Sequence, residues 1–113
     1  MVIIKTTSAF RKLSSKLLNE VLLEELYVFI SANPESGKII PGTGGVRKLR
    51  WKSATNNKGK SGGVRILYHY HQEILILLLT LYSKSDQDSI TDLERAELKR
   101  KLPLLIAEHM EDL

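Results

Sequence analysis

The stretch GTGGVRKLRWKSATNNKGKSGGVRILYHY, Gly42–Tyr70, decides the fold, because it contains two strand patterns and most of the chain's excess positive charge. The window Lys38–His71 holds eight Lys and Arg residues and no Asp or Glu. The rest of the chain has nine Lys and Arg against thirteen Asp and Glu, so a net charge of +4 conceals a basic segment in an acidic remainder. Such segregation indicates a polyanionic partner, most plausibly nucleic acid. The alternative is a solvated basic loop.

Two segments of this stretch alternate with the period of two that is typical of strands. In Val46–Lys52 one face carries Lys48, Arg50 and Lys52, and the other carries Arg47, Leu49 and Trp51. In Val64–His71 one face carries Val64, Ile66, Tyr68 and Tyr70, and the other carries Arg65, Leu67, His69 and His71. If the two strands pair with the polar faces aligned, four cations form one patch. These are Lys48, Arg50, Lys52 and Arg65. We expect Ser53–Gly63 to be a polar, mobile loop that adds Lys58 and Lys60 at the rim.

The flanking sequence predicts helices before this stretch and after it. Val2–Lys5 has a strand pattern, and apolar residues then recur at helical spacing from Ala9 to the break at Asn33-Pro34, as a helical hairpin or one kinked helix. Ile39-Ile40 is a short extended segment before a Pro-Gly turn.

After the basic stretch, Ile74–Tyr82 is apolar at nearly every position and predicts a strand buried on both sides. Thr91 begins a helix signature, and Pro103 is expected to kink or stop that helix before a last short helix at Leu104–Met110. The predicted order is β-α-α-β-β-β-α. We therefore expect one α+β domain over residues 1–113, with the helices on one face of a small curved, mainly antiparallel sheet.

Composition and motifs exclude several classes. The chain has no Cys, so it has no disulfide or Cys-based zinc site. Its longest apolar run, Ile74–Leu79, is far shorter than the roughly 20 residues that span a bilayer, and the N-terminus lacks a signal-peptide core, so we expect a cytoplasmic protein. Gly59-Lys60-Ser61 lacks the earlier glycine of a P-loop, because position 54 is Ala54. Gly42–Gly45 precedes a strand, so it is not a dinucleotide fingerprint. We expect no cofactor and no metal.

The cationic patch admits two interpretations from the residues alone. Cations held on a rigid sheet can bind phosphate, or they can stabilise the extra negative charge on phosphorus during attack by a ribose 2′-hydroxyl. A lysine crowded by other cations can serve as the general base, whereas an arginine suits charge stabilisation. On the residues alone, RNA binding is preferred over catalysis.

The chain resembles the RelE/HigB superfamily of toxins from bacterial type II toxin–antitoxin systems, and it is closest to the HigB type. The resemblance rests on GTGGVRKLR at Gly42–Arg50, GKSGGVRILY at Gly59–Tyr68 and LYSK at Leu81–Lys84. NPESG at Asn33–Gly37 and DLERAEL at Asp92–Leu98 extend it over nearly the whole chain.

The resemblance implies a RelE-like fold and a ribosome-dependent mRNA endonuclease (mRNA interferase). Such toxins enter the ribosomal A site and cleave mRNA by 2′-hydroxyl attack without a metal. Their usual partner is a helix-turn-helix antitoxin of the HigA type. The catalytic positions of the family fall on Lys48, Arg50, Arg65 and Lys84. RNA contacts are expected from Arg47, Lys52, Lys58, Lys60, His69 and His71.

The sequence departs from the RelE pattern at two places. Ser85 stands where many members have an Arg after the Lys that matches Lys84, and no aromatic residue follows Tyr82. The general acid and base therefore stay open: the basic residues suffice, or His69 or His71 contributes. Tyr82 and Tyr68 match family positions, but core packing is the preferred role for both. Two other functions stay open, namely a non-catalytic ribosome- or RNA-binding module and a ParE-like gyrase-inhibiting toxin.

Overall fold

A computed structural model describes residues 1–53 and 63–113. Its elements are β1 (Ile3–Thr6), α1 (Ser8–Leu17), α2 (Glu20–Ala32), β2 (Lys38–Ile39), β3 (Arg47–Trp51), β4 (Val64–His71), β5 (Leu75–Ser83) and α3 (Asp92–Met110). The strands form one sheet in the order β1-β5-β4-β3-β2, in which β1 and β5 are parallel and the other pairs are antiparallel. The predicted α+β class and mainly antiparallel sheet are confirmed. The short segment predicted at Ile39-Ile40 forms β2, which adds one strand to the expected order.

The first two helices form the hairpin that the sequence allowed, because polar side chains cap each of them. The Thr7 hydroxyl accepts a hydrogen bond from the Phe10 amide at 3.0 Å, and the Asn19 side chain accepts one from the Leu22 amide at 2.8 Å. Each cap satisfies an amide that the first turn of a helix leaves without a partner. Asn19 therefore divides the apolar pattern into two helices instead of one kinked helix.

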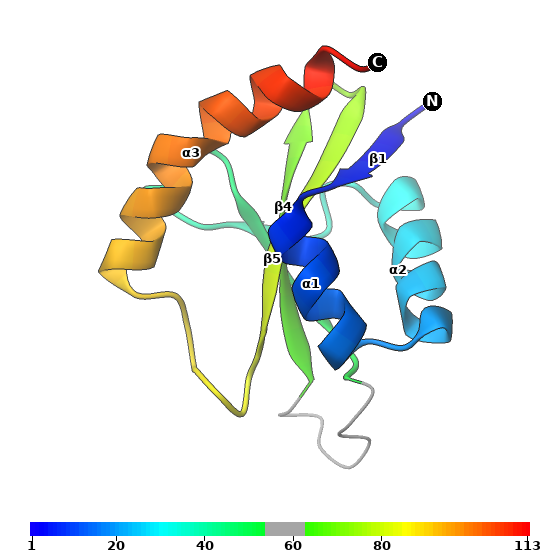
Figure 1. Ribbon diagram of the computed structural model, residues 1–113, viewed down its shortest axis with the longest axis vertical. Coiled ribbons are helices and arrows are strands. Elements are labelled where there is room, and N and C mark those ends of the chain that lie inside the picture. Colours follow the sequence, from blue (N-terminus) through cyan, green and yellow to red (C-terminus); the bar gives the residue numbers. More distant parts are fainter. Residues whose placement is uncertain (54–62) are drawn as a thin grey trace.

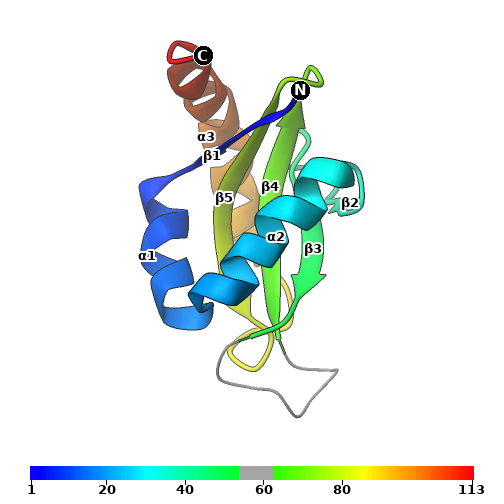
Figure 2. The same ribbon diagram turned by 90° about the vertical axis from the view of Figure 1, so that its right-hand side faces the viewer.

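The helices cover both faces of the sheet, so the expectation that they share one face is wrong. One core contains Phe10, Leu26 and Ile30 from α1 and α2, packed on Ile66 and Ile76. The other core contains Leu102 of α3 together with Leu67, Leu75, Leu77 and Leu79. Figure 1 shows β4 and β5 between α3 and α2, and Figure 2 shows α2 in front of the strands with α3 behind them. The physical reason is that β4 and β5 carry apolar side chains on both faces, and each face needs a cover.

A bulge in β5 changes which face its last residues occupy. Leu67 of β4 is opposite Thr80, whereas the next residue, Tyr68, is opposite Leu78, so Leu79 is an extra residue on β5. Before the bulge, Leu75 and Leu77 face α3; after it, Leu81 packs in the α1/α2 core and Tyr82 packs in the α3 core. The bulge therefore turns Tyr82 toward α3, where strict alternation would have turned it toward α1 and α2.

Helix α3 continues through Pro103, so the predicted stop is wrong, and Leu104–Met110 is the end of this helix and not a separate short one. Proline has no amide hydrogen and therefore leaves one carbonyl of the preceding turn without its helical partner. Pro103 and Lys99, four residues before it, are both exposed, and water can satisfy that carbonyl. Leu102, Leu105 and Ile106 keep the helix packed on the sheet on either side of the proline. None of the helices in residues 1–53 and 63–113 is long and apolar enough to cross a membrane.

The hydroxyl of Tyr68 ties the segment after α2 to the centre of the sheet. It donates a hydrogen bond to the Pro34 carbonyl at 2.8 Å and accepts one from the Gly37 amide at 2.9 Å. The Tyr68 side chain is fully buried, so both backbone groups depend on this hydroxyl. The core role predicted for Tyr68 is confirmed.

We predict that Tyr68→Phe lowers the free energy of unfolding by about 1–3 kcal/mol, because the buried Gly37 amide and the part-buried Pro34 carbonyl lose their partner. Urea unfolding monitored by circular dichroism measures this loss. Tyr70→Phe is the matched control, because the half-buried Tyr70 hydroxyl has no hydrogen-bond partner among the described residues. Equal losses in the two variants would contradict this role of Tyr68.

Candidate nucleic-acid interface

Three side chains from adjacent strands form a row on the α3 face of the sheet. Arg50 of β3 is directly opposite Arg65 of β4, and Arg65 is directly opposite Tyr82 of β5. Side chains directly opposite each other in a sheet have Cβ atoms about 4.5–5.5 Å apart. The two arginine side chains therefore start from neighbouring positions on one face of the sheet.

Lys48 extends this row along β3. It is opposite Leu67, two residues from Arg50, so it shares the α3 face. The predicted alignment of the two cationic strand faces is confirmed. We call Lys48, Arg50 and Arg65 the basic row. Like charges at opposite positions are unfavourable on a sheet, and a bound anion would offset that repulsion. Neither Lys48 nor Arg50 forms an ion pair with any residue in the described part of the chain.

Arg65 is buried, with only 6% of its surface exposed, whereas Arg50 is exposed. Arg65 therefore lies within the core, unlike the other two members of the basic row. Its Nη1 also donates to the Val64 carbonyl at 3.4 Å. A guanidinium stays charged at any physiological pH, so this position holds a fixed positive charge at the base of the basic row.

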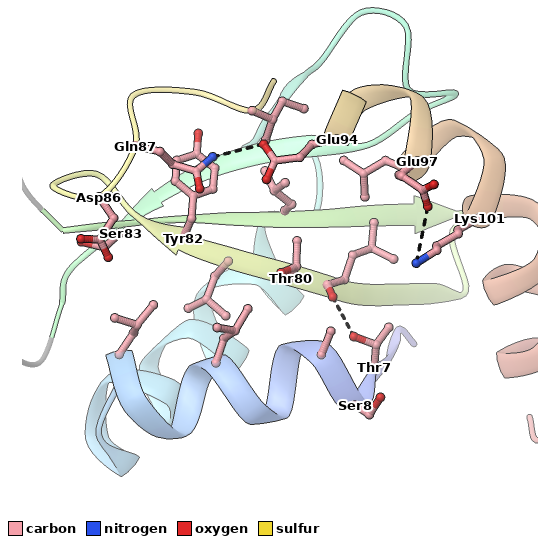
Figure 3. A pocket seen from close by; sticks show the side chains of 18 of the residues that line it. Thr7, Ser8, Thr80, Tyr82, Ser83, Asp86, Gln87, Glu94, Glu97 and Lys101 are labelled. Carbon is pink, nitrogen blue, oxygen red and sulfur yellow. Dashed lines mark hydrogen bonds and ion pairs between the residues drawn. The ribbon is translucent and has the colours of Figure 1, made fainter. Parts of the chain in front are cut away.

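Tyr82 brings a hydroxyl to the end of the basic row. Its side chain is 8% exposed and packs in the α3 core, as predicted, but its hydroxyl has no hydrogen-bond partner among the described residues. Burial raises the pKa of Tyr82, while the charge of Arg65 opposes that rise. Figure 3 shows the ring directed from β5 toward the segment that leads into α3. The position of Tyr82 next to Arg65 depends on the β5 bulge, which no sequence pattern announces.

Lys84 follows the last strand, and an acidic partner holds its side chain. Its amide donates to the Gly63 carbonyl at 3.0 Å, and its ammonium group lies 2.6 Å from a carboxylate oxygen of Asp88. The hydrogen bond from Lys84 and its charge lower the pKa of Asp88. Lys84 is thus anchored beside the last residues of β5, with its charge shared with Asp88.

Arg47 lies on the opposite face of the sheet from the basic row. Its guanidinium donates to the carbonyls of Glu35 and Gly37 at 3.2 and 2.8 Å and lies 3.9 Å from the Glu35 carboxylate. These contacts give Arg47 a structural role in holding the turn after α2. The structure does not bring it together with Lys48, Arg50 and Arg65.

His69 and His71 follow Leu67 on the α3 face of β4, and their ring centroids are 5.5 Å apart. His69 Nδ1 is 2.9 Å from the Gly45 carbonyl, so this nitrogen carries the proton and Nε2 is left free. Burial is the main reason that the pKa of His69 is lowered, and the charges of His71 and Arg47 add to the effect. His69 is therefore neutral at neutral pH.

Gly45 makes the close approach of His69 possible. A Cβ atom at position 45 would lie 3.1 Å from Cε1 of His69, and the φ angle of Gly45 is +122°. Residues with a Cβ atom rarely adopt that φ angle, so the Gly45 carbonyl reaches the imidazole because this residue is glycine. Gly45 thus provides both a positive φ and a close backbone approach before β3.

The remaining predicted contacts lie at the rim of the basic row or beyond what is described. Lys52 follows β3 and is exposed. Lys58 and Lys60 lie in residues 54–62, outside the described residues.

No protein-family model matches the chain.

We predict that acidification destabilises this protein partly through His69. Because the pKa of His69 is lowered in the folded state, the unfolded chain takes up a proton more readily as the pH falls below about 6.5. This contribution to the free energy of unfolding is therefore complete above about 6.5 and declines as the pH falls toward the folded-state pKa. Urea titrations between neutral and acidic pH measure the decline. The decline should be smaller in His69→Gln than in His109→Gln, which removes the half-buried histidine in the last turn of α3. Identical pH dependence in the wild type and His69→Gln would show that His69 does not titrate on unfolding.

Proposed function

We propose that this protein is a RelE/HigB-like toxin that cleaves mRNA on the ribosome. The observation that carries the proposal is the basic row, in which the cross-strand pair Arg50 and Arg65 is continued along β3 by Lys48. Strands hold these charges in a fixed geometry, which electrostatic stabilisation of a transition state requires. The resemblance of Gly42–Arg50 and Gly59–Tyr68 to this superfamily supplies the substrate class and the reaction.

In the proposed reaction a ribose 2′-oxygen attacks the adjacent phosphorus, and the bond from phosphorus to the 5′-oxygen breaks. The products are a 2′,3′-cyclic phosphate and a 5′-hydroxyl end. One proton leaves the 2′-hydroxyl, and one proton is delivered to the departing 5′-oxygen. Arg50 and Arg65 would bind the non-bridging phosphate oxygens, whose negative charge grows as the fifth bond forms.

Two groups on this face suit the proton transfers. His69 is neutral at neutral pH and leaves Nε2 free, so it suits the general base. Lys48 of β3 is opposite Leu67 of β4, and His69 is two residues beyond Leu67 on the same face, so Lys48 and His69 are diagonal neighbours. The Lys48 ammonium group can donate a hydrogen bond to phosphate or to the leaving oxygen. Tyr82 offers a second donor, its hydroxyl, at the far end of the row beside Arg65.

The partners in this proposal follow from the resemblance. The substrate is mRNA in the ribosomal A site, and Lys52 with Lys58 and Lys60 would contact rRNA. A helix-turn-helix antitoxin of the HigA type would neutralise the toxin. This proposal places the protein in the cytoplasm, where translating ribosomes are found.

We predict that induction of the protein in growing bacteria produces new mRNA ends within translated frames. Lys48→Ala and Arg50→Ala should each reduce this cleavage at least about tenfold, because a charge-assisted hydrogen bond contributes about 1.5–3 kcal/mol. Primer extension on a translated reporter mRNA measures the cuts. Lys99→Ala and Arg100→Ala are matched controls, because they remove exposed positive charges from α3, outside the basic row.

Arg65 needs a separate design, because its side chain is buried and its removal affects packing. Arg65→Lys keeps the charge but loses the planar fork, so cleavage should fall while the urea midpoint changes little. Growth arrest without new mRNA ends, with ribosome binding retained, would replace the proposal with a non-catalytic RNA-binding module. Growth arrest with loss of DNA supercoiling and intact mRNA would replace it with a gyrase-inhibiting toxin.

A further inference from the structure

A groove of about 700 Å³ lies between α1 and α3, along the edge of β5. Five consecutive residues of β5, from Leu79 to Ser83, line it. Successive strand residues point to opposite faces, so a cavity lined by all of them follows the edge of the strand. Figure 3 shows α1 on one side of this edge and α3 on the other, with Thr80 and Tyr82 between them.

The groove lies at the level of the sheet, along the part of β5 that β1 does not cover. Strand β1 pairs with β5 only from Leu75 to Leu78, and the chain then turns away into α1. Helices α1 and α3 both extend past Leu78, and their apolar side chains form the two walls of the groove. From α1 these are Ala9, Leu13 and Leu17; from α3 they are Leu93, Leu98 and Leu105.

Part of the β5 backbone that faces this groove has no hydrogen-bond partner among residues 1–53 and 63–113. The Leu78 carbonyl accepts the Thr7 amide at 3.1 Å, and the Leu79 carbonyl accepts the Thr7 hydroxyl at 2.7 Å. At the other end, the Ser83 carbonyl accepts the amides of Asp86 and Gln87. Between these ends, no described residue hydrogen-bonds to the outer edge of the strand. An edge of this kind is a template for another strand.

The rim of the groove is acidic, in contrast to the basic row. Asp86, Glu94 and Glu97 line it, with Lys101 as the one cation among the lining residues that are described. Lys101 lies 3.6 Å from Glu97, so its charge is already shared. Asp86 and Glu94 form no ion pair with a described residue. The charge of the rim selects against RNA and in favour of a basic ligand.

We propose that this groove binds an extended segment of a partner protein, which adds a strand to β5. The segment carries a short apolar run, because its alternate side chains would point toward the α1 wall and the α3 wall. Lys or Arg residues flank that run and meet the carboxylates of Asp86 and Glu94. This site is separate from the basic row, and the proposal does not depend on RNA cleavage.

The probe is a fluorescein-labelled octapeptide, Lys-Lys-Val-Ile-Val-Leu-Lys-Lys, blocked at both ends. Fluorescence anisotropy should show saturable micromolar binding to the full chain. Leu93→Lys should weaken binding at least about tenfold, because it removes an apolar wall and adds a like charge. Leu104→Lys is the matched control on the same helix outside the groove, because both leucines are strongly exposed, at 75% and 65%, and neither exchange disturbs the core.

Two analogues of the peptide test strand addition itself. Each is N-methylated at alternate amides of the apolar run. In one analogue the methylated amides point to one edge of the extended peptide, and in the other they point to the opposite edge. The proposal requires that one analogue binds and the other does not, since only one edge pairs with β5. Absence of saturable binding, equal loss in Leu93→Lys and Leu104→Lys, or equal binding of both analogues would overturn it. Equal binding of a peptide with Glu in place of Lys would do the same. A dimer in sedimentation velocity that Leu93→Lys dissociates would assign the groove to a second copy of the chain instead.

Discussion

The burial of β4 and β5 on both faces is the constraint on which the rest of this structure depends. Leu67 and Leu77 require a cover on one side, and Ile66 and Ile76 require one on the other. The hairpin of α1 and α2 covers the face that carries Ile66 and Ile76, and α3 covers the face that carries Leu67 and Leu77. The basic row lies on the face that α3 covers, at the end of the strands where the apolar side chains give way to charged ones.

The same sheet gives neighbouring arginines different roles. Arg47 and Arg50 are three residues apart on β3 and therefore lie on opposite faces. Arg47 has its hydrogen bonds satisfied by the turn after α2, so its charge is part of the scaffold. Arg50 is exposed, opposite the buried Arg65, so the charge of Arg50 is available to a ligand. A count of basic residues in the sequence does not separate these two roles.

The sequence predicted the strand faces and the alignment of Lys48, Arg50 and Arg65, because alternation along a paired strand depends on local chemistry. It allowed the hairpin as one of two alternatives, and it predicted the start of α3 at Thr91, because a capping signature is also local. The second helix layer was missed because Leu67 was grouped with polar neighbours, although β5 alone already required covers on two sides. The position of Tyr82 was missed because a bulge is set by the pairing of two strands. Pro103 was overestimated as a helix breaker because packing by Leu102 and Leu105 compensates for one lost hydrogen bond.

The parallel pairing of β1 with β5 has a consequence for synthesis on the ribosome. The Thr7 hydroxyl binds the Leu79 carbonyl across 72 residues of chain. At about 5–20 residues per second, β1 leaves the ribosome roughly 4–14 seconds before the strand that it pairs with. The hairpin of α1 and α2, which ends at Ala32, also leaves the ribosome before the strands β4 and β5 on which it packs. Assembly of this fold is therefore a late, nearly simultaneous event, and the basic row acquires its geometry only when most of the chain has been made.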